Sequence, residues 1–286
     1  MASMVPAAYF GAMMAALRVL LGLGLLAAGA AGCQSAAQPA GAGVVPGPGG
    51  PGPAALAPLP DSLRPTPVPA VAGVPDTLRQ AIAQLYSRLG PDTVGLRPAV
   101  LEQACVGYLT LHPSGRIERG GVLAVADMDL PNTAERLWII DLQQGKVLAH
   151  SLVAHGRGSG HLRARRFSNQ ASSNCTSLGF YRTSGTYAGK HGYSRRLLGL
   201  DKGQNANAFD RYVVLHAADY ASPTYAQAHG HLGYSQGCPA LPPAQYKQII
   251  STLRAGSLLL LSGPGLASRW LDGPAAGRRF ARRGWR

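Results

Sequence analysis

A histidine and a cysteine in the second half of the chain have the types and the setting that thiol chemistry needs. His216 ends the β-branched, apolar run that starts at Arg211, and Cys238 ends the glycine-bearing turn that starts at Ser235. The two residues are 22 positions apart, which is enough for a strand to end, a loop to cross and the thiol to return beside the imidazole. A neighbouring imidazole can lower the pKa of a thiol and hold a thiolate–imidazolium pair, so the pattern predicts a nucleophile and its base.

The residues next to the cysteine suit acyl transfer. Gly237 allows a tight turn, and we expect the backbone N–H groups of Gly237 and Cys238 to point at a developing oxyanion. Pro239 has no N–H and a fixed φ, which stiffens the exit from the turn. On chemistry alone an alternative stays open, because a cysteine can be a small buried hydrophobe and a histidine at a strand end can serve only as a hydrogen-bonding group.

Further motifs stand in order along the chain, from about residue 80 to about residue 265. They are His155-Gly-Arg157-x-Ser159-Gly160, Phe167-Ser168-Asn169, Ser177-Leu-Gly-Phe-Tyr181, Gly189-Lys-His-Gly192, His216 and Ser235-x-Gly-Cys-Pro-Ala240. The set resembles the L,D-transpeptidase catalytic-domain family of peptidoglycan enzymes, and more narrowly its subgroup of murein L,D-transpeptidase catalytic domain proteins. The resemblance implies a β-sandwich-like fold with Cys238 as the acylated nucleophile and His216 as its base.

Several positions near the expected site depart from the family pattern. Better-known members have a histidine just before the Gly-Cys pair, where this chain has Gln236. The subgroup usually has Arg at the position of Tyr234, Gly at the position of Ala217 and Asp at the position of Ala206. Since the nucleophile and the base are retained, the departures concern substrate contacts and loop geometry.

The resemblance implies a definite reaction on peptidoglycan stem peptides. Cys238 attacks the carbonyl of an L-centre residue in a tetrapeptide stem, expels D-alanine and forms a thioester. His216 takes the thiol proton and passes it to the leaving amine, and the resemblance implies that the carbonyl of Ala217 orients its ring. Asp219 is the alternative partner for the ring, against a role in capping the loop. An incoming amine then resolves the thioester, so the reaction requires no cofactor and no metal.

Stem peptides carry carboxylates, which suit charge-assisted hydrogen bonds from basic side chains. The expected substrate contacts are Arg157, Ser159, Lys190, His191, Arg211 and Ser235. For each cation the alternative is a solvated surface charge, and Ser235 can bind either substrate or its own backbone. A zinc site built from His229, His231 and Cys238 is a competing interpretation, but no further His or Cys spacing completes a recognised set.

The start of the chain predicts export. Residues 1–33 contain one charge and a short apolar run that ends in small residues before Cys33, which resembles a bacterial lipoprotein-type signal peptide with Cys33 as the lipidated residue. Ordinary cleavage after the sequence Ala28-Gly29-Ala30 is the alternative. Either route leads to the bacterial cell envelope, and we expect a periplasmic protein anchored in a membrane by its lipid.

Composition divides the rest of the chain into three parts. Residues 34–75 are almost all Ala, Pro, Gly and Val, which is typical of an extended tether. Residues 76–266 form the expected catalytic domain. Residues 267–286 carry six Arg and one Asp of a chain with formal net charge +14, and this basic tail either binds an anionic surface or is disordered. Export argues against a nucleic-acid partner.

Hydrophobic periodicity predicts a mainly β (α+β) domain with flanking helices. The resemblance implies that this domain is an L,D-transpeptidase-like β-sandwich. Amphipathic helices are expected after Pro75, Pro98 and Pro243. Short strands are expected over 122–127, 137–142, 147–154, 178–182, 197–200, 212–216 and 257–261. We expect Cys105 to be buried and Cys175 to line the site, and a disulfide between them stays possible.

Two other functions remain open from sequence. An L,D-carboxypeptidase would form the same thioester and transfer it to water. A non-catalytic, wall-binding lipoprotein would carry a degenerate site, and the departures at Ala217, Tyr234 and Gln236 are the features that favour it.

Overall fold

The structure, a computed structural model, describes residues 64–117 and 120–286. The expected signal peptide, the lipidation site Cys33 and most of the expected tether lie outside these residues. Within the described ranges, no helix combines the length and the apolar character that a membrane crossing requires.

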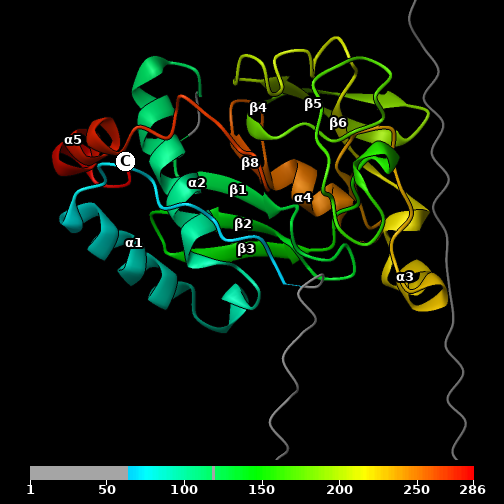
Figure 1. The fold of residues 1–286 in the computed structure, drawn as a ribbon, viewed down its shortest axis with the longest axis horizontal. Helices are drawn as coiled ribbons and strands as arrows, with labels where there is room; N and C mark the ends of the chain where they lie inside the picture. Colours follow the sequence, from blue (N-terminus) through cyan, green and yellow to red (C-terminus); the bar gives the residue numbers. More distant parts are fainter. Residues whose placement is uncertain (1–63, 118–119) are drawn as a thin grey trace, which may run out of the picture. The chain divides into compact units, whose positions relative to one another are not determined.

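One mixed eight-stranded sheet, ordered β3-β2-β1-β8-β4-β5-β6-β7, forms the centre of the fold (Figure 1). The strands are β1 (Val122–Asp127), β2 (Leu137–Asp141), β3 (Lys146–Ser151), β4 (Gly179–Gly189), β5 (Gly192–Gly199), β6 (Val214–Ala217), β7 (Ala240–Leu241) and β8 (Leu258–Ser262). β1 pairs with β8 in parallel, β6 pairs with β7 in parallel, and the other pairs are antiparallel. Together with the helices, this sheet confirms the predicted α+β class.

The two faces of the sheet support two hydrophobic cores, because side chains alternate along each strand. Leu123 and Val125 of β1 point into a core shared with helices. Ala124 and Ala126 point into a second core, which also takes side chains from β4, β5, β6 and β7. The second core is therefore covered by both halves of the sheet, which accounts for the sandwich-like packing. Strands such as β1 are apolar on both faces because each face contributes to one of the two cores.

Helices pack around this sheet. They are α1 (Asp76–Leu89), α2 (Pro98–Leu111), α3 (Pro223–His229), α4 (Tyr246–Thr252) and α5 (Gly273–Arg283), with short 3₁₀ turns at η2 (Gly90–Thr93), η3 (His112–Ser114), η4 (Arg157–Ser159) and η5 (Asp219–Ala221). Helices α1, α2 and α5 lie together on one side of the sheet (Figure 1). Gly107 lets α2 approach β4, because a Cβ there would lie 1.9 Å from the ring of Phe180.

Two strands are longer than the periodicity predicts. β4 runs to Gly189 and β5 starts at Gly192, so the two strands form a long hairpin with Lys190 and His191 at its turn. The added residues are largely exposed and include several glycines, so they lack the apolar alternation by which a strand is detected. Backbone pairing, which sequence pattern does not show, extends the hairpin.

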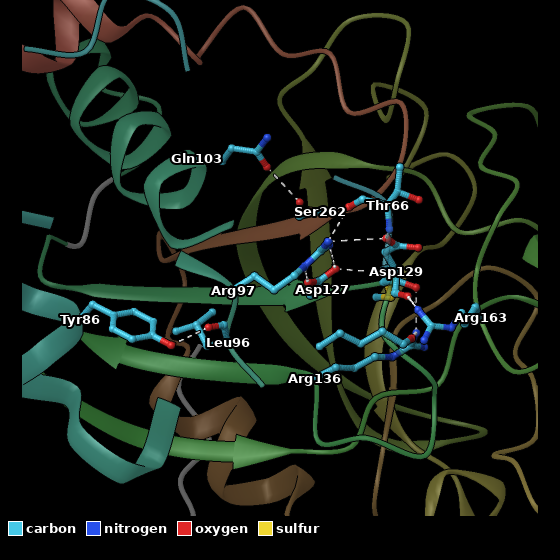
Figure 2. Close-up of polar contacts among 12 residues, drawn as sticks. Thr66, Tyr86, Leu96, Arg97, Gln103, Asp127, Asp129, Arg136, Arg163 and Ser262 are labelled. Atoms are coloured by element: carbon cyan, nitrogen blue, oxygen red, sulfur yellow. Dashed lines mark hydrogen bonds and ion pairs between the residues drawn. The ribbon is translucent and has the colours of Figure 1, made fainter. Parts of the chain in front are cut away.

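Residues 64–75, the last part of the expected tether, are attached to the folded domain by ionic contacts (Figure 2). The backbone N–H of Thr66 donates to the carboxylate of Asp129, and Arg97 donates to the Thr66 carbonyl at 2.7 Å. Arg97 also forms a two-point ion pair with the buried Asp127, at 2.6 and 2.8 Å. The folded unit thus begins before residue 76, because buried carboxylates hold the preceding segment.

The basic segment 267–286 contains the helix α5, and it is not a disordered tail. Ala276 and Gly277 are buried, and a Cβ at Gly277 would lie 2.4 Å from the ring of Pro75. Asp272 caps the helix by accepting a hydrogen bond from the Ala275 N–H at 2.8 Å. Small residues on one face of the helix allow this close packing, while its arginines point mainly to the surface.

Candidate active site

A cavity of about 730 Å³ contains both members of the expected catalytic pair. Its wall includes His216 and Cys238, with Lys190 and His191 from the turn between β4 and β5. Cys238 is partly exposed on this wall, so its sulfur is not sealed away from solvent.

The parallel pairing of β6 with β7 places the cysteine beside the strand that carries the histidine. His216 pairs with Ala240, so Cys238 lies just before the paired residues. Its Sγ donates a hydrogen bond to the carbonyl of Tyr212 at 3.6 Å, near the start of β6. Among the described residues no hydrogen bond joins this sulfur to the imidazole, and such contacts commonly tighten only when substrate is bound.

A backbone carbonyl orients the imidazole. Nδ1 of His216 lies 2.9 Å from the carbonyl oxygen of Ala217, the partner that the resemblance implies. This bond places the proton on Nδ1 and leaves Nε2 as the acceptor. Asp219 is exposed at the start of η5, so the structure does not make it the partner of the ring.

Burial is the largest cause of the pKa shifts of both Cys238 and His216. It raises the pKa of the Cys238 thiol, against the opposing effects of the Val214 backbone and of nearby cations. Burial also lowers the pKa of His216, and the neighbouring His191 and Lys190 lower this pKa further. The rings of His191 and His216 have centroids 4.5 Å apart. Both shifts favour a neutral thiol beside a neutral imidazole.

The double variant Lys190→Gln, His191→Ala is expected to move the acidic limb of the pH–rate profile to higher pH. His216 must be neutral to accept a proton, so activity falls as the pH drops through its lowered pKa. Removing the two groups relieves repulsion of the imidazolium and raises that pKa. The profile of kcat/KM against pH measures the shift, and an acidic limb that stays in place or moves to lower pH contradicts the assignment.

The turn that carries the cysteine uses one of the two expected oxyanion donors. Ser235 Oγ accepts a hydrogen bond from the Gly237 N–H at 3.0 Å and donates one to the Cys238 carbonyl at 2.6 Å. The Gly237 N–H is therefore engaged inside the turn. Among the described residues the Cys238 N–H has no hydrogen-bond partner, so it remains the donor that a substrate oxygen can use. Of the two roles expected for Ser235, the structure shows the bonds to its own backbone, and the residue also lines the cavity.

Arg211 holds the loop over this turn and is not a free substrate contact. Its guanidinium donates to the carbonyls of Cys175 at 2.7 Å and Ser168 at 2.8 Å, and to Ser177 Oγ at 3.3 Å. A Cβ at Gly237 would lie 2.8 Å from the Cys175 carbonyl, so glycine is required where the loop meets the turn. The guanidinium thus couples the loop to the cysteine turn.

Arg211→Met is expected to lower the free energy of unfolding by about 2–4 kcal/mol, because several hydrogen bonds to a charged group are lost and buried carbonyls are left unpaired. Urea denaturation measures the change. Arg157→Met is the matched control, since Arg157 is exposed and its replacement is expected to change stability by less than about 0.5 kcal/mol. Equal stability of the two variants would contradict the assigned role.

Within residues 64–117 and 120–286, the other cysteines are buried free thiols. Cys105 and Cys175 form no disulfide, and Cys175 lies beneath the site without lining the cavity. A Cβ at Gly158 would lie 2.8 Å from the Cys175 sulfur, which shows how closely η4 covers it. The prediction that Cys175 lines the site is therefore wrong, because its side chain points under the loop.

Two of the expected substrate contacts lie outside the cavity wall. The Arg157 side chain is exposed, and its backbone N–H donates to the Ser235 carbonyl at 2.9 Å. Ser159 is buried, and its Oγ accepts a hydrogen bond from the Thr176 N–H at 2.9 Å. Both residues support the site from behind, and only Lys190 and His191 of the expected contacts present free side chains to the cavity.

A buried arginine supports the first motif. The guanidinium of Arg136 donates to the carbonyls of Met128, Leu130 and Val153, and it lies 2.8 Å from His155 Nδ1. Burial and this adjacent cation lower the pKa of His155 to about 3, so the ring is neutral at physiological pH. Figure 2 includes Arg136 in the network around the acidic residues. His155 therefore orders the loop and takes no part in the cavity.

Tyrosines form much of the cavity wall. Most of them carry no sequence motif that indicates a functional site. Tyr187, Tyr212, Tyr220 and Tyr234 all line the cavity, and only the unusual residue at 234 was evident from sequence. Burial and the nearby Cys238 together raise the pKa of Tyr220 to about 12, so its hydroxyl stays protonated as a donor. Aromatic residues without a motif give no signal of a shared cavity.

The histidines near α3 are engaged with aromatic rings. His229 stacks on Tyr225 with ring centroids 3.9 Å apart, and His231 stacks on Tyr234 at 5.4 Å. In the part of the chain that the structure covers, no three His, Cys, Asp or Glu side chains are grouped closely enough to hold a metal ion. These rings form a wall beside the cavity.

Comparison with known proteins identifies the family. The L,D-transpeptidase catalytic domain profile matches residues 92–261, which is more than half of the chain. The chain therefore belongs to the L,D-transpeptidase catalytic domain family. No curated protein matches it.

The chain is similar to several solved structures at low sequence identity. An L,D-transpeptidase from Mycobacterium smegmatis is 16% identical with a TM-score of 0.33, over 50% of this chain and 59% of that one. L,D-transpeptidase 3 from Mycobacterium tuberculosis is 12% identical with a TM-score of 0.33, over 50% and 61%. An L,D-transpeptidase from Stackebrandtia nassauensis is 18% identical with a TM-score of 0.31, over 65% and 78%. The chain spans less than two thirds of the two mycobacterial proteins.

Proposed function

We propose that this protein is a peptidoglycan-modifying cysteine acyltransferase, an L,D-transpeptidase. The observation that carries the proposal is the shared cavity, in which Cys238 is partly exposed and His216 presents Nε2 as an acceptor. Family membership indicates the same chemistry. A cavity of this volume is large enough for a peptide segment.

In the proposed reaction the neutral imidazole of His216 removes the thiol proton as the sulfur attacks the stem carbonyl. The Cys238 N–H binds the oxyanion, and the loss of such a donor typically costs about 3 kcal/mol of transition-state stabilisation. The carbon–nitrogen bond then breaks, His216 returns the proton to the leaving D-alanine amine, and a thioester remains. An acceptor amine attacks the thioester, transfers its proton to His216 and regenerates the thiol.

The proposed substrate is the tetrapeptide stem of peptidoglycan, and the proposed location is the bacterial cell envelope. Export and a lipid anchor at Cys33 follow from the sequence of residues 1–33, which lie outside the described part of the chain. A lipid anchor with an extended tether would let the domain reach from a membrane into the wall.

Product analysis tests the proposal. The purified protein is incubated with a defined disaccharide tetrapeptide, with and without an added amine acceptor, and the products are identified by mass. We expect release of D-alanine and a cross-linked or amine-capped product that depends on the acceptor. Release of D-alanine with a tripeptide product alone would assign an L,D-carboxypeptidase. Binding to sacculi without turnover would assign a non-catalytic wall-binding protein and refute the proposal.

A further inference from the structure

A second, smaller cavity adjoins the catalytic one. Its volume is about 150 Å³, and it shares Tyr187, Tyr212 and Val214 with the wall of the catalytic cavity. Arg196, Phe209 and Val213 complete its lining. Drug-sized ligands occupy about 300–1,000 Å³, so this cavity suits one small residue of a longer ligand.

The cation in this cavity is held by aromatic rings. The Arg196 guanidinium carbon lies 4.9 Å from the ring centroid of Tyr187 and 5.7 Å from that of Phe209. In the part of the chain that the structure covers, the Arg196 side chain forms no ion pair and no hydrogen bond. A guanidinium that stacks on aromatic rings through its flat faces still has its N–H groups free at the edge of the plane. A carboxylate can accept two parallel hydrogen bonds from that edge.

Strand pairing places this cation close to the proposed base. Arg196 of β5 pairs with Val214 of β6, and His216 follows two residues later on the same face. From strand geometry the Cα atoms of Arg196 and His216 are about 8 Å apart. Arg196 and the proposed base therefore occupy neighbouring positions on one face of the sheet.

Tyr212 has a strained backbone and lines both cavities. Tyr212 has φ +56°, a left-handed conformation that is unfavourable for a bulky side chain, and its side chain is 76% exposed. Its carbonyl accepts the hydrogen bond from the Cys238 thiol. Phe209 is also 46% exposed, so two large aromatic side chains that line the smaller cavity are open to solvent. Strain and exposed aromatic surface concentrate at binding sites.

We infer that Arg196, flanked by Tyr187, Phe209 and Tyr212, binds the terminal carboxylate of the residue that the reaction expels. This inference rests on the proposed function, in which that residue is the D-alanine of the stem. Holding its carboxylate orients the scissile bond toward Cys238 and selects stems that end at this residue. The expected contacts from Arg157 and Arg211 do not supply this group, because one is outside the cavity and the other is bonded to loop carbonyls.

The test is a binding measurement on the Cys238→Ala form of the full chain, with a stem tetrapeptide and its C-terminal amide as the ligands. A charge-assisted contact predicts that the carboxylate form binds about ten- to a hundred-fold more tightly than the amide. Arg196→Met is expected to abolish this preference, and Arg196→Lys to retain part of it. Arg269→Met is the matched control, because Arg269 stacks on Trp270 at 4.3 Å and lies outside both cavities.

Equal preference for the carboxylate before and after Arg196→Met would overturn the inference. Should that variant fail to fold, Phe209→Ser removes one of the supporting rings at an exposed position and is expected to weaken the preference at least three-fold. Turnover of the Cys238-containing protein separates this question from the proposed function. If the wild-type protein turns over stems but Arg196→Met keeps the preference for the carboxylate ligand, the subsite alone is rejected. If the preference depends on Arg196 but the wild-type protein shows no turnover, the transpeptidase activity alone is rejected.

Discussion

Cys238→Ala is expected to abolish acyl-enzyme formation with a carbapenem and to reduce turnover of tetrapeptide stems by about 10³-fold or more. A carbapenem presents a strained acyl group, which the thiol attacks in place of the stem carbonyl. Alanine has no nucleophile, so the protein cannot retain the acyl group as a thioester. Intact-protein mass spectrometry measures the adduct directly, since the wild-type protein gains one carbapenem mass and the variant gains none.

Matched controls come from Cys105 and Cys175, the other two cysteines that the structure describes. Cys105 and Cys175 are both buried free thiols and do not line the cavity, so Cys105→Ala and Cys175→Ala are expected to form the adduct as the wild type does. Burial raises the pKa of Cys105 strongly, which makes it unreactive. An adduct that persists in Cys238→Ala would show that another residue is the nucleophile.

His216→Gln is expected to lower kcat by about 10²–10⁴-fold, which is the usual contribution of a general base. The reason is the protonation state of the site, because burial raises the pKa of the Cys238 thiol and leaves it neutral at pH 7. Without an acceptor at His216, the thiol must lose its proton to solvent. Reactivity toward iodoacetamide is therefore expected to fall at neutral pH and to recover only as the pH rises toward the raised pKa of the thiol.

The iodoacetamide rate as a function of pH provides the measurement, and His229→Gln provides the control. His229 lies at the end of α3 and stacks on Tyr225 outside the cavity, so its replacement is expected to leave the rate profile unchanged. A His216→Gln variant that alkylates at the wild-type rate at pH 7 would contradict the assignment of the base.

The supporting residues show how the site is held in place. Arg211 and Ser235 are polar groups that sequence reasoning assigned to substrate, yet both are hydrogen-bonded to the backbone of the site. A buried carbonyl or N–H needs a partner, and a nearby side chain that satisfies it is no longer free for a ligand. Lys190 and His191 remain available because they lie at the turn of a hairpin, which has few buried backbone groups to satisfy.

The sequence by itself determined the chemistry and the main elements of the fold. The histidine at a strand end, the cysteine after a glycine turn and the ordered motifs predicted the pair, and hydrophobic periodicity predicted the buried strands and amphipathic helices. These features are local, since the spacing of apolar side chains along a strand or a helix determines which face is buried. The outer part of the β4–β5 hairpin escaped prediction, because its exposed residues carry no such pattern.

Only the tertiary structure decided how the polar groups divide between scaffold and cavity. The Gly237 N–H is bonded to Ser235, Arg211 reaches a loop more than 30 positions away in the chain, and Arg196 lines a cavity that shares residues with the one around Cys238. Each outcome depends on which donors and acceptors meet after strands distant in sequence have paired. That competition for hydrogen-bond partners is a property of the folded arrangement, and residue types and spacing alone do not contain it.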